Sequence, residues 1–178
     1  IELQIGEGDR LVDLVREGID CVLRVGNLQD SSMVAQQVAR LEQVTVASPD
    51  YLARHGRPET LDELGRHLAV NYISSATLRP YPLEFLVDGE LRQLTLPGAV
   101  SVTGADMYIA GASAGLGIVQ VPRYRVEDQL HSGELCVLLP QLTPPPLPAC
   151  VLYPQSRQLS PRVRVFVDWL KDIFAGFG

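Results

Sequence analysis

The sequence predicts an α/β protein made of two lobes that are joined by two crossing segments. The first observation is a helix over residues 103–115 followed by a short apolar strand over residues 118–121, which is typical of a buried sheet covered by helices. A similar pattern of strand, helix and strand occupies residues 1–25. The third observation is a stiff proline-rich connector over residues 142–148, after which one more strand and helix complete the chain.

These observations divide the chain into lobe I, residues 1–44 plus 142–178, and lobe II, residues 45–141. A chain that leaves one lobe, builds a second and then returns creates a cleft and a hinge. The chain has 178 residues, 46% of them hydrophobic, so it is long enough for one large domain or for two small lobes.

Lobe I is predicted to open with a βαβ unit. Residues 1–5 alternate apolar and polar side chains as a strand does, and residues 20–25 form a second strand. Between them, an apolar helical stripe over residues 11–15 follows Asp9 as N-cap and ends at Gly18. Because a helical crossover joins parallel strands, we expect these two strands to be parallel members of one sheet.

Local start and stop signals define the elements that follow. Ser48-Pro49 starts a helical turn that Gly56 closes, and Thr60-x-x-Glu63 is a capping box that opens another short helix. Asp88-Gly89 is a two-residue hairpin signal within residues 83–96. The other predicted strands are residues 34–39, 44–47, 68–73, 99–102, 135–139 and 149–153, and the other predicted helices are residues 122–131, ended by Gly133, and a final helix beginning at Pro161.

The helix and strand of lobe II contain two patterns that resemble catalytic motifs. Thr103 is expected to cap this helix and Gly115 to end it, and Pro122 ends the strand. Gly111–Gly115 matches G-x-S-x-G, but a hydrolase needs a strand before Ser113 and a helix after it. The same order of elements argues against a dinucleotide-binding loop at these glycines. The sequence therefore predicts a protein that is not an enzyme and binds no cofactor.

The composition and charge of the chain disfavour several classes of partner. A net charge of −6 and a pI near 5.0 disfavour direct binding to DNA, and neither a membrane span nor a signal peptide is visible. Cys21, Cys136 and Cys150 are odd in number and lie in apolar runs without C-x-x-C spacing, which favours reduced, buried thiols in the cytoplasm. No histidine lies at ligand spacing from them, so no metal site is expected. The first residue is Ile1, which we interpret as the start of a fragment or processed piece.

Three segments are candidate ligand contacts because ligands of open α/β sheets bind at the carboxyl ends of strands. Arg24 and the loop over residues 26–33 follow one strand, although Arg24 equally fits an ion pair with a surface acid. The hydroxyl-rich residues 74–77 follow another, where they could bond a ligand or, more commonly, their own backbone. The helix start at Thr103 offers N–H groups that attract anions.

Four segments resemble, in order and spacing, the effector-binding region of LysR-type transcriptional regulators. They are GDRLVDLVREGIDCVLRVG (residues 8–26), ASPDYLARHG (47–56), ASAGLGIVQVPRY (112–124) and VLYPQSRQLSPRVRVFVDWL (151–170). The resemblance covers almost the full length of the chain. No single segment is diagnostic, but together they are a specific signal.

The resemblance implies two Rossmann-like lobes, as in type 2 periplasmic binding proteins, with a small-molecule effector between them. It also implies a cytoplasmic homodimer or tetramer that binds DNA through a separate N-terminal winged helix-turn-helix, without membrane contact. The region usually begins with an earlier strand and helix, so Ile1 corresponds to the second strand of the family.

By position, the resemblance implies an effector pocket at ten residues. They are Arg24, Gly26, Ser32, Met33, Ser74, Ser75, Thr103, Gly104, Gly117 and Ile118. A small carboxylate or an aromatic acid fits Arg24 together with the Thr103 end of the helix. Met33 and Tyr72 could add apolar contact, although core packing is their more usual role. The alternative function is a solute-binding protein of a transport system, which has the same fold, and an enzyme that uses Ser113 ranks third.

Overall fold

The computed structural model describes residues 2–6, 8, 13–26, 33–74, 77–155 and 160–177. The chain forms two compact units. Unit 1 comprises Ile1–Glu7, Leu11–Leu41 and Pro146–Gly178, and unit 2 comprises Gly8–Arg10 and Glu42–Pro145. The chain enters the main part of unit 2 after Leu41 and returns to unit 1 at Pro146.

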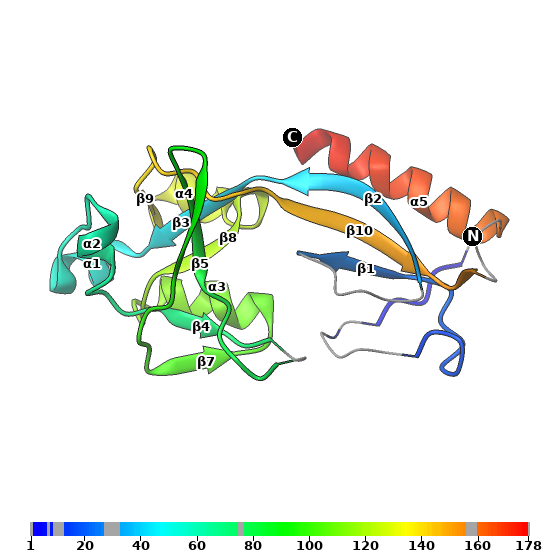
Figure 1. Ribbon diagram of the computed structural model, residues 1–178, viewed down its shortest axis with the longest axis horizontal. Helices are drawn as coiled ribbons and strands as arrows, with labels where there is room; N and C mark the ends of the chain where they lie inside the picture. Colours follow the sequence, from blue (N-terminus) through cyan, green and yellow to red (C-terminus); the bar gives the residue numbers. More distant parts are fainter. Residues whose placement is uncertain are drawn as a thin grey trace. The chain divides into compact units, whose positions relative to one another are not determined.

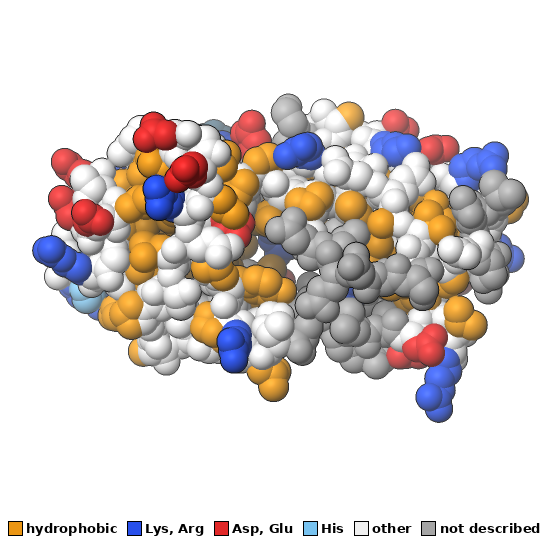
Figure 2. Space-filling model, viewed as in Figure 1, with side chains coloured by type: hydrophobic (Ala, Val, Ile, Leu, Met, Phe, Trp, Pro, Cys, Tyr) orange, Lys and Arg blue, Asp and Glu red, His pale blue; other side chains and the backbone are white. Residues whose placement is uncertain are grey.

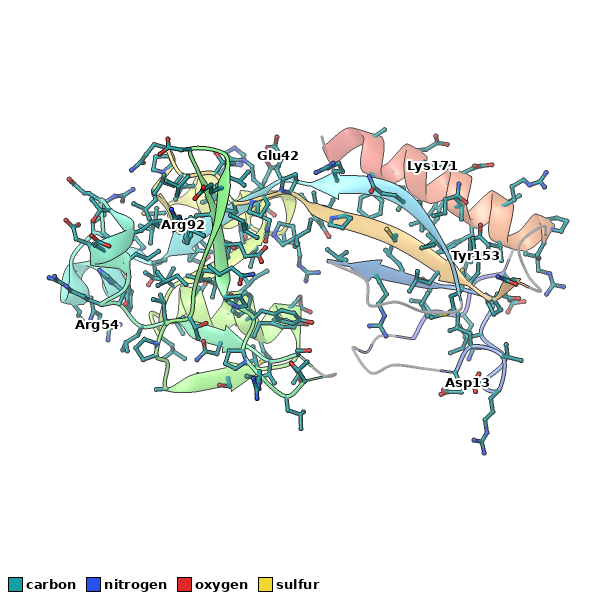
Figure 3. All side chains as sticks on the ribbon, viewed as in Figure 1. Asp13, Glu42, Arg54, Arg92, Tyr153 and Lys171 are labelled. Carbon is teal, nitrogen blue, oxygen red and sulfur yellow. The ribbon has the colours of Figure 1, made fainter. Side chains whose placement is uncertain are left out.

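Unit 1 is an antiparallel sheet covered by a helix. The strands lie in the order β1 (Val22–Val25), β10 (Leu147–Tyr153) and β2 (Val34–Leu41), and the helix is α5 (Pro161–Phe174), followed by the short η3 (Ala175–Phe177). Figure 1 shows α5 running along β2 and β10. Val163, Val167 and Leu170 of α5 pack against Val151 and Tyr153 of β10, the latter labelled in Figure 3. The predicted strands 34–39 and 149–153 and the final helix are confirmed.

The predicted parallel strand pair at the start of the chain is wrong for the described residues. Residues 2–6 form no strand, and β1 pairs with β10 in an antiparallel register that sets Arg24 opposite Cys150. Leu3 and Ile5 are exposed instead of packed. Alternating side chains indicate which face a strand would bury, but a strand also needs a neighbour to accept its hydrogen bonds. Asp9 and residues 11–12 lie outside the described residues.

Unit 2 is built on a mixed sheet. It contains an antiparallel group, β8 (Val119–Pro122), β3 (Gln43–Ala47) and β9 (Cys136–Leu138), and a parallel pair, β4 (Val70–Tyr72) and β7 (Val100–Val102). A parallel bridge between Ala69 and Ile118 joins the two groups, with Ile118 N donating to Leu68 O at 2.9 Å. The strands therefore follow one another as β7, β4, β8, β3 and β9.

Helix α3 (Ala105–Ser113) connects β7 to β8 and packs beside β4 (Figure 1). Gly111 permits this approach, because a Cβ there would lie 3.0 Å from a methyl of Val70. Gly115 has a left-handed φ of +73°, as predicted for a helix stop, and its carbonyl accepts a 2.6 Å bond from Arg54, which Figure 3 labels. Ser113 is the last residue of the helix, so the predicted order of helix before strand is confirmed.

The local signals predicted at Ser48, Thr60, Asp88-Gly89 and Gly133 are confirmed. Ser48 and Thr60 cap α1 (Pro49–His55) and α2 (Leu61–Leu64) by accepting from Tyr51 N and Glu63 N, each at 3.2 Å. Asp88 and Gly89 both have positive φ, as a type I′ turn requires, between β5 (Leu83–Val87) and β6 (Glu90–Leu94). Gly133 ends α4 (Glu127–Ser132), which follows η1 (Arg123–Arg125). Figure 2 shows charged side chains of both signs over the hairpin, where Arg92 and Glu90 form an exposed ion pair.

Strand β5 is held to the rest of unit 2 by the side chain of Gln120 on β8. The Gln120 Oε1 accepts from Glu84 N at 2.9 Å, while Nε2 donates to Glu84 O at 3.0 Å and to Thr45 Oγ1 at 3.1 Å. The amide of one side chain thus supplies the donor and acceptor that a neighbouring strand would supply. Below this contact, Phe85 is fully buried in an apolar cluster with Leu83 and Ile118.

The fully buried Tyr51 of α1 links two histidines to the backbone. Its hydroxyl accepts from Leu68 N at 2.8 Å and lies 3.1 Å from His67 Nδ1, and its ring stacks on His55 at 4.5 Å. Burial lowers the pKa of the His67 imidazole below its usual value of 6.5, the charge of His55 lowers it further, and Glu63 opposes the shift. The structure therefore favours neutral His67, and the tyrosine hydroxyl has two neighbouring acceptors for its proton, His67 Nδ1 and Leu68 O at 3.3 Å.

This contact predicts that the domain loses stability in mild acid. Below about pH 6.5 His67 binds a proton more readily in the unfolded chain than in the folded chain, so its contribution to the free energy of unfolding should fall as the pH drops through and below that value. His67→Asn, which retains an acceptor near Tyr51, should flatten the dependence. Urea unfolding between pH 5 and 8 measures this, and equal pH slopes for His67→Asn and the unmodified chain would contradict it.

Candidate functional site

Two predicted ligand contacts of unit 2 lie side by side at the carboxyl ends of two parallel strands of its sheet. Strands β4 and β7 are parallel and in register from Val70↔Val100 to Tyr72↔Val102, and Ile73 N donates to Val102 O at 2.7 Å. Ser74 follows β4 and Thr103 follows β7, so both stand at the carboxyl ends of neighbouring strands. Their closeness follows from the register of the strands and does not depend on the position of unit 1.

Ser74 is buried and organises its own loop. Its Oγ accepts from Thr77 N at 3.3 Å, its carbonyl accepts from Leu78 N at 2.8 Å, and its N–H donates to Arg79 O at 2.9 Å. These bonds match the commoner of the two roles considered for this serine, that of a turn former.

Thr103 does not cap α3, which corrects the prediction from the sequence. The N-cap is Gly104, with extended dihedrals of φ −116° and ψ 138°, and no side chain caps the helix. The helix starts one residue later than expected, which places the Thr103 hydroxyl too early in the chain to reach the second or third helical N–H. Thr103 and Gly104 are both exposed at this helix start, which has no side-chain cap for its first N–H groups.

A row of three tyrosine rings in contact runs from the core to the surface near these strand ends. Tyr108 of α3 is buried, and its hydroxyl accepts from Gln120 N at 3.2 Å; burial raises its pKa to about 12. Tyr72 at the end of β4 is half-buried and meets Tyr108 edge to face, with ring centroids 5.4 Å apart. The ring centroid of Tyr81 lies 6.0 Å from that of Tyr72, and Tyr81 is 57% exposed.

Sequence reasoning considered Tyr72 but missed Tyr81, Tyr108 and the ion pair of Arg125 with Asp106. Strand β8 runs parallel to β4, so η1 begins at the same edge, and Arg125 of η1 pairs at 2.5 Å with Asp106 in the first turn of α3. No short-range pattern links these residues, because they come from four segments. A prediction of the topology that placed β4, β7 and β8 side by side would have revealed these residues, because they lie near the carboxyl ends of those strands.

Gly117 and Ile118 lie at the opposite end of these strands, the amino-terminal end. Ile118 bridges Ala69, five residues before Ser74, which corresponds to roughly 16 Å along a strand. The Ile118 side chain is fully buried in the core, and a Cβ at Gly117 would lie 2.6 Å from the carbonyl carbon of Ala69. These two residues precede a strand, whereas Ser74 and Thr103 follow one. The structure does not bring them together with the other candidates of unit 2.

The remaining candidates belong to unit 1 or lie outside the described residues. Arg24 is half-buried on β1, and Gly26 ends that strand with φ +107° while its N–H donates to Pro148 O at 2.9 Å. Met33 is half-buried immediately before β2. Ser32 and Ser75 lie outside the described residues.

Within the described ranges, no group of three histidine, cysteine, aspartate or glutamate side chains is arranged to hold a metal ion. None of the described helices is both long enough and apolar enough to cross a membrane. The cysteines are free thiols; Cys150 is buried, which raises the pKa of its thiol, whereas Cys21 and Cys136 are only half-buried.

The comparisons with known proteins agree with one another. A family model described as the LysR substrate binding domain matches residues 1–175. The chain is 36% identical over 173 residues to the HTH-type transcriptional regulator YhjC of Escherichia coli K12, covering 97% of this chain and 58% of that protein. It is 34% identical over 176 residues to an HTH-type transcriptional repressor of Pseudomonas aeruginosa UCBPP-PA14, covering 98% of this chain and 55% of the relative.

Solved structures show the same fold. The regulatory domain of CrgA, a LysR-type transcriptional regulator from Neisseria meningitidis, superposes with a TM-score of 0.75 at 26% identity, covering 97% of this chain and 81% of that one. The chain spans little more than half the length of the curated relatives given above. Its fold is the two-lobed α/β fold of type 2 periplasmic binding proteins, and the chain belongs to the LysR substrate-binding domain family.

Proposed function

We propose that this chain is the effector-sensing part of a longer LysR-type regulator that binds DNA through a separate domain, works in the cytoplasm as a homo-oligomer and catalyses no reaction. The family match over residues 1–175 carries this proposal, and the relatives favour it over a solute-binding protein because they are transcriptional regulators. The element order of α3 and β8 supports the absence of a serine nucleophile, since Ser113 ends a helix.

In unit 2 we propose the effector contact at the carboxyl edge formed by Ser74, Thr103 and Gly104. The 2.7 Å bond between Ile73 N and Val102 O supports it, because this bond holds the two strand ends together. The start of the nine-residue helix α3 has no side-chain cap and therefore favours an anionic group. A small carboxylate is accordingly the proposed effector class. Arg24, Gly26, Ser32 and Met33 remain the proposed contacts of unit 1, and Ser75 that of unit 2. Gly117 and Ile118 are left out, since their contacts are those of core packing.

A thermal-shift screen of small carboxylates against the 178-residue chain tests the proposal. A ligand that binds only the folded state stabilises it by about 2.7 kcal/mol at a concentration of one hundred times its Kd. The same ligand should change operator binding by the complete regulator, with a coupling of about 1–3 kcal/mol. A regulator whose operator affinity ignores every ligand that stabilises this chain would count against a sensing role.

A further inference from the structure

Backbone hydrogen bonds join the two described ends of the segment between β4 and β5. Ser74 N donates to Arg79 O, and Leu78 N donates to Ser74 O. Where the loop returns, Ile73 bridges Pro80, and Tyr81 N donates to Tyr72 O at 2.9 Å. These bonds set Tyr81 beside Tyr72.

The loop holds Leu78 in a conformation that the residue does not favour. Leu78 has φ +55°, in the left-handed region where a side chain is strained, and it is 78% exposed. Burial of this side chain in the unit therefore does not offset the strain. Strained positions that their surroundings enforce are concentrated at ligand-contacting segments, which motivates asking what this loop contacts.

The tyrosines beside the loop present a ring surface of graded burial. Tyr108 is anchored in the core, Tyr72 packs edge to face on it, and Tyr81 extends the row to a largely exposed ring. Aromatic rings attract further rings in offset or edge-to-face geometries. Tyr72, in the middle of this row, lies two residues before Ser74, at the strand end where the effector contact is proposed.

We propose that the effector carries an aromatic ring and that Tyr81 and Tyr72 bind it, so that the ligand is an aromatic acid rather than an aliphatic one. This inference rests on the proposed function, because it names the chemical class that enters the same edge. A small molecule fits the surface better than a protein partner. The large apolar side chains exposed here, in the part that the structure describes, are Leu78, Tyr81 and Met107, too few for the roughly 800 Å² that each partner of a stable interface buries.

The test uses pairs of acids that differ only in aromaticity. The 178-residue chain is titrated with benzoate against cyclohexanecarboxylate, phenylacetate against cyclohexylacetate, and 2-naphthoate against its decahydro counterpart, with thermal shift and calorimetry as readouts. We expect at least one aromatic member to bind more tightly than its saturated partner. Tyr81→Ala should weaken that binding about tenfold, which is the upper range for one aromatic contact.

Two matched variants separate ring contact from general damage. Tyr81→Phe retains the ring and should bind within about twofold of the unmodified chain, and Leu91→Ala removes an exposed apolar side chain from β6 and should have no effect. Saturated acids that bind as well as aromatic ones, or binding that ignores Tyr81→Ala, would overturn the aromatic assignment and leave the sensing role intact. If no acid of either kind shifts the melting temperature, both this inference and the proposed carboxylate class fail.

Discussion

Replacing Gly117 by alanine is expected to destabilise the domain by about 3 kcal/mol, because the added methyl meets backbone rather than a movable side chain. The new Cβ would lie 2.6 Å from Ala69 C and 2.8 Å from Val70 N. Relief requires the bridge between Ala69 and Ile118 to open, and that bridge joins the parallel and antiparallel parts of the sheet. The melting temperature should fall by roughly 2–4 °C for each kcal/mol in a chain of this size.

Gly104→Ala is the matched control. A Cβ at Gly104 meets no atom within 4 Å, and the residue has a negative φ, so the change should cost only about 0.5 kcal/mol through its lower preference for an N-cap. The two glycines were proposed for the same pocket on the sequence, yet the structure gives them opposite tolerance. Equal melting temperatures for the two variants would show that Gly117 is not packed against Ala69 as described.

Removing the Gln120 side chain is expected to have the next largest effect. Gln120→Ala leaves the N–H and carbonyl of Glu84 and the hydroxyl of Thr45 without the partner they share, and each such group costs about 1–3 kcal/mol when it is buried. Because these groups are only partly buried and water can replace some bonds, we expect a total of about 2–3 kcal/mol. Chemical unfolding of the variant measures this.

Gln93→Ala provides the comparison. Gln93 also contacts Glu84, at 2.8 Å, but through an exposed pair of side chains, so its loss should change stability by less than about 0.5 kcal/mol. Hydrogen exchange adds a local readout, since the Glu84 amide should exchange faster in Gln120→Ala and at an unchanged rate in Gln93→Ala. A Gln120→Ala variant as stable as Gln93→Ala would contradict the role of this amide in holding β5.

Sequence reasoning succeeded where the cause of structure is local. Ser48, Thr60 and the Asp88-Gly89 pair act on backbone groups within three residues, so their effect can be predicted without knowledge of the fold. It failed at residues 2–6, where a strand depends on a partner that the pattern itself does not specify. Thr103 failed by a single residue, because which residue takes the N-cap conformation depends on how the preceding strand ends.

The candidate site shows the same division. Ser74 and Thr103 lie near each other because they follow two neighbouring parallel strands, β4 and β7. The order of elements in the sequence indicates such a parallel arrangement. Gly117 and Ile118 share a motif with the family, but they stand before a strand, at the far edge from Ser74. The row from Tyr108 to Tyr81 joins a helix, a strand and a loop, so it became visible only when the topology placed their ends together.

The central claim is that an effector binds unit 2 at the carboxyl ends of β4 and β7. Titrating a ¹⁵N-labelled sample of the chain with a ligand from the carboxylate screen, and following its amide resonances, tests this most directly. The claim predicts that the amides of Ser74, Thr103 and Gly104 shift and saturate together, while those of Gly117 and Leu116 stay nearly unchanged. Saturable shifts centred on Gly117, with Ser74 and Thr103 unmoved, would contradict it.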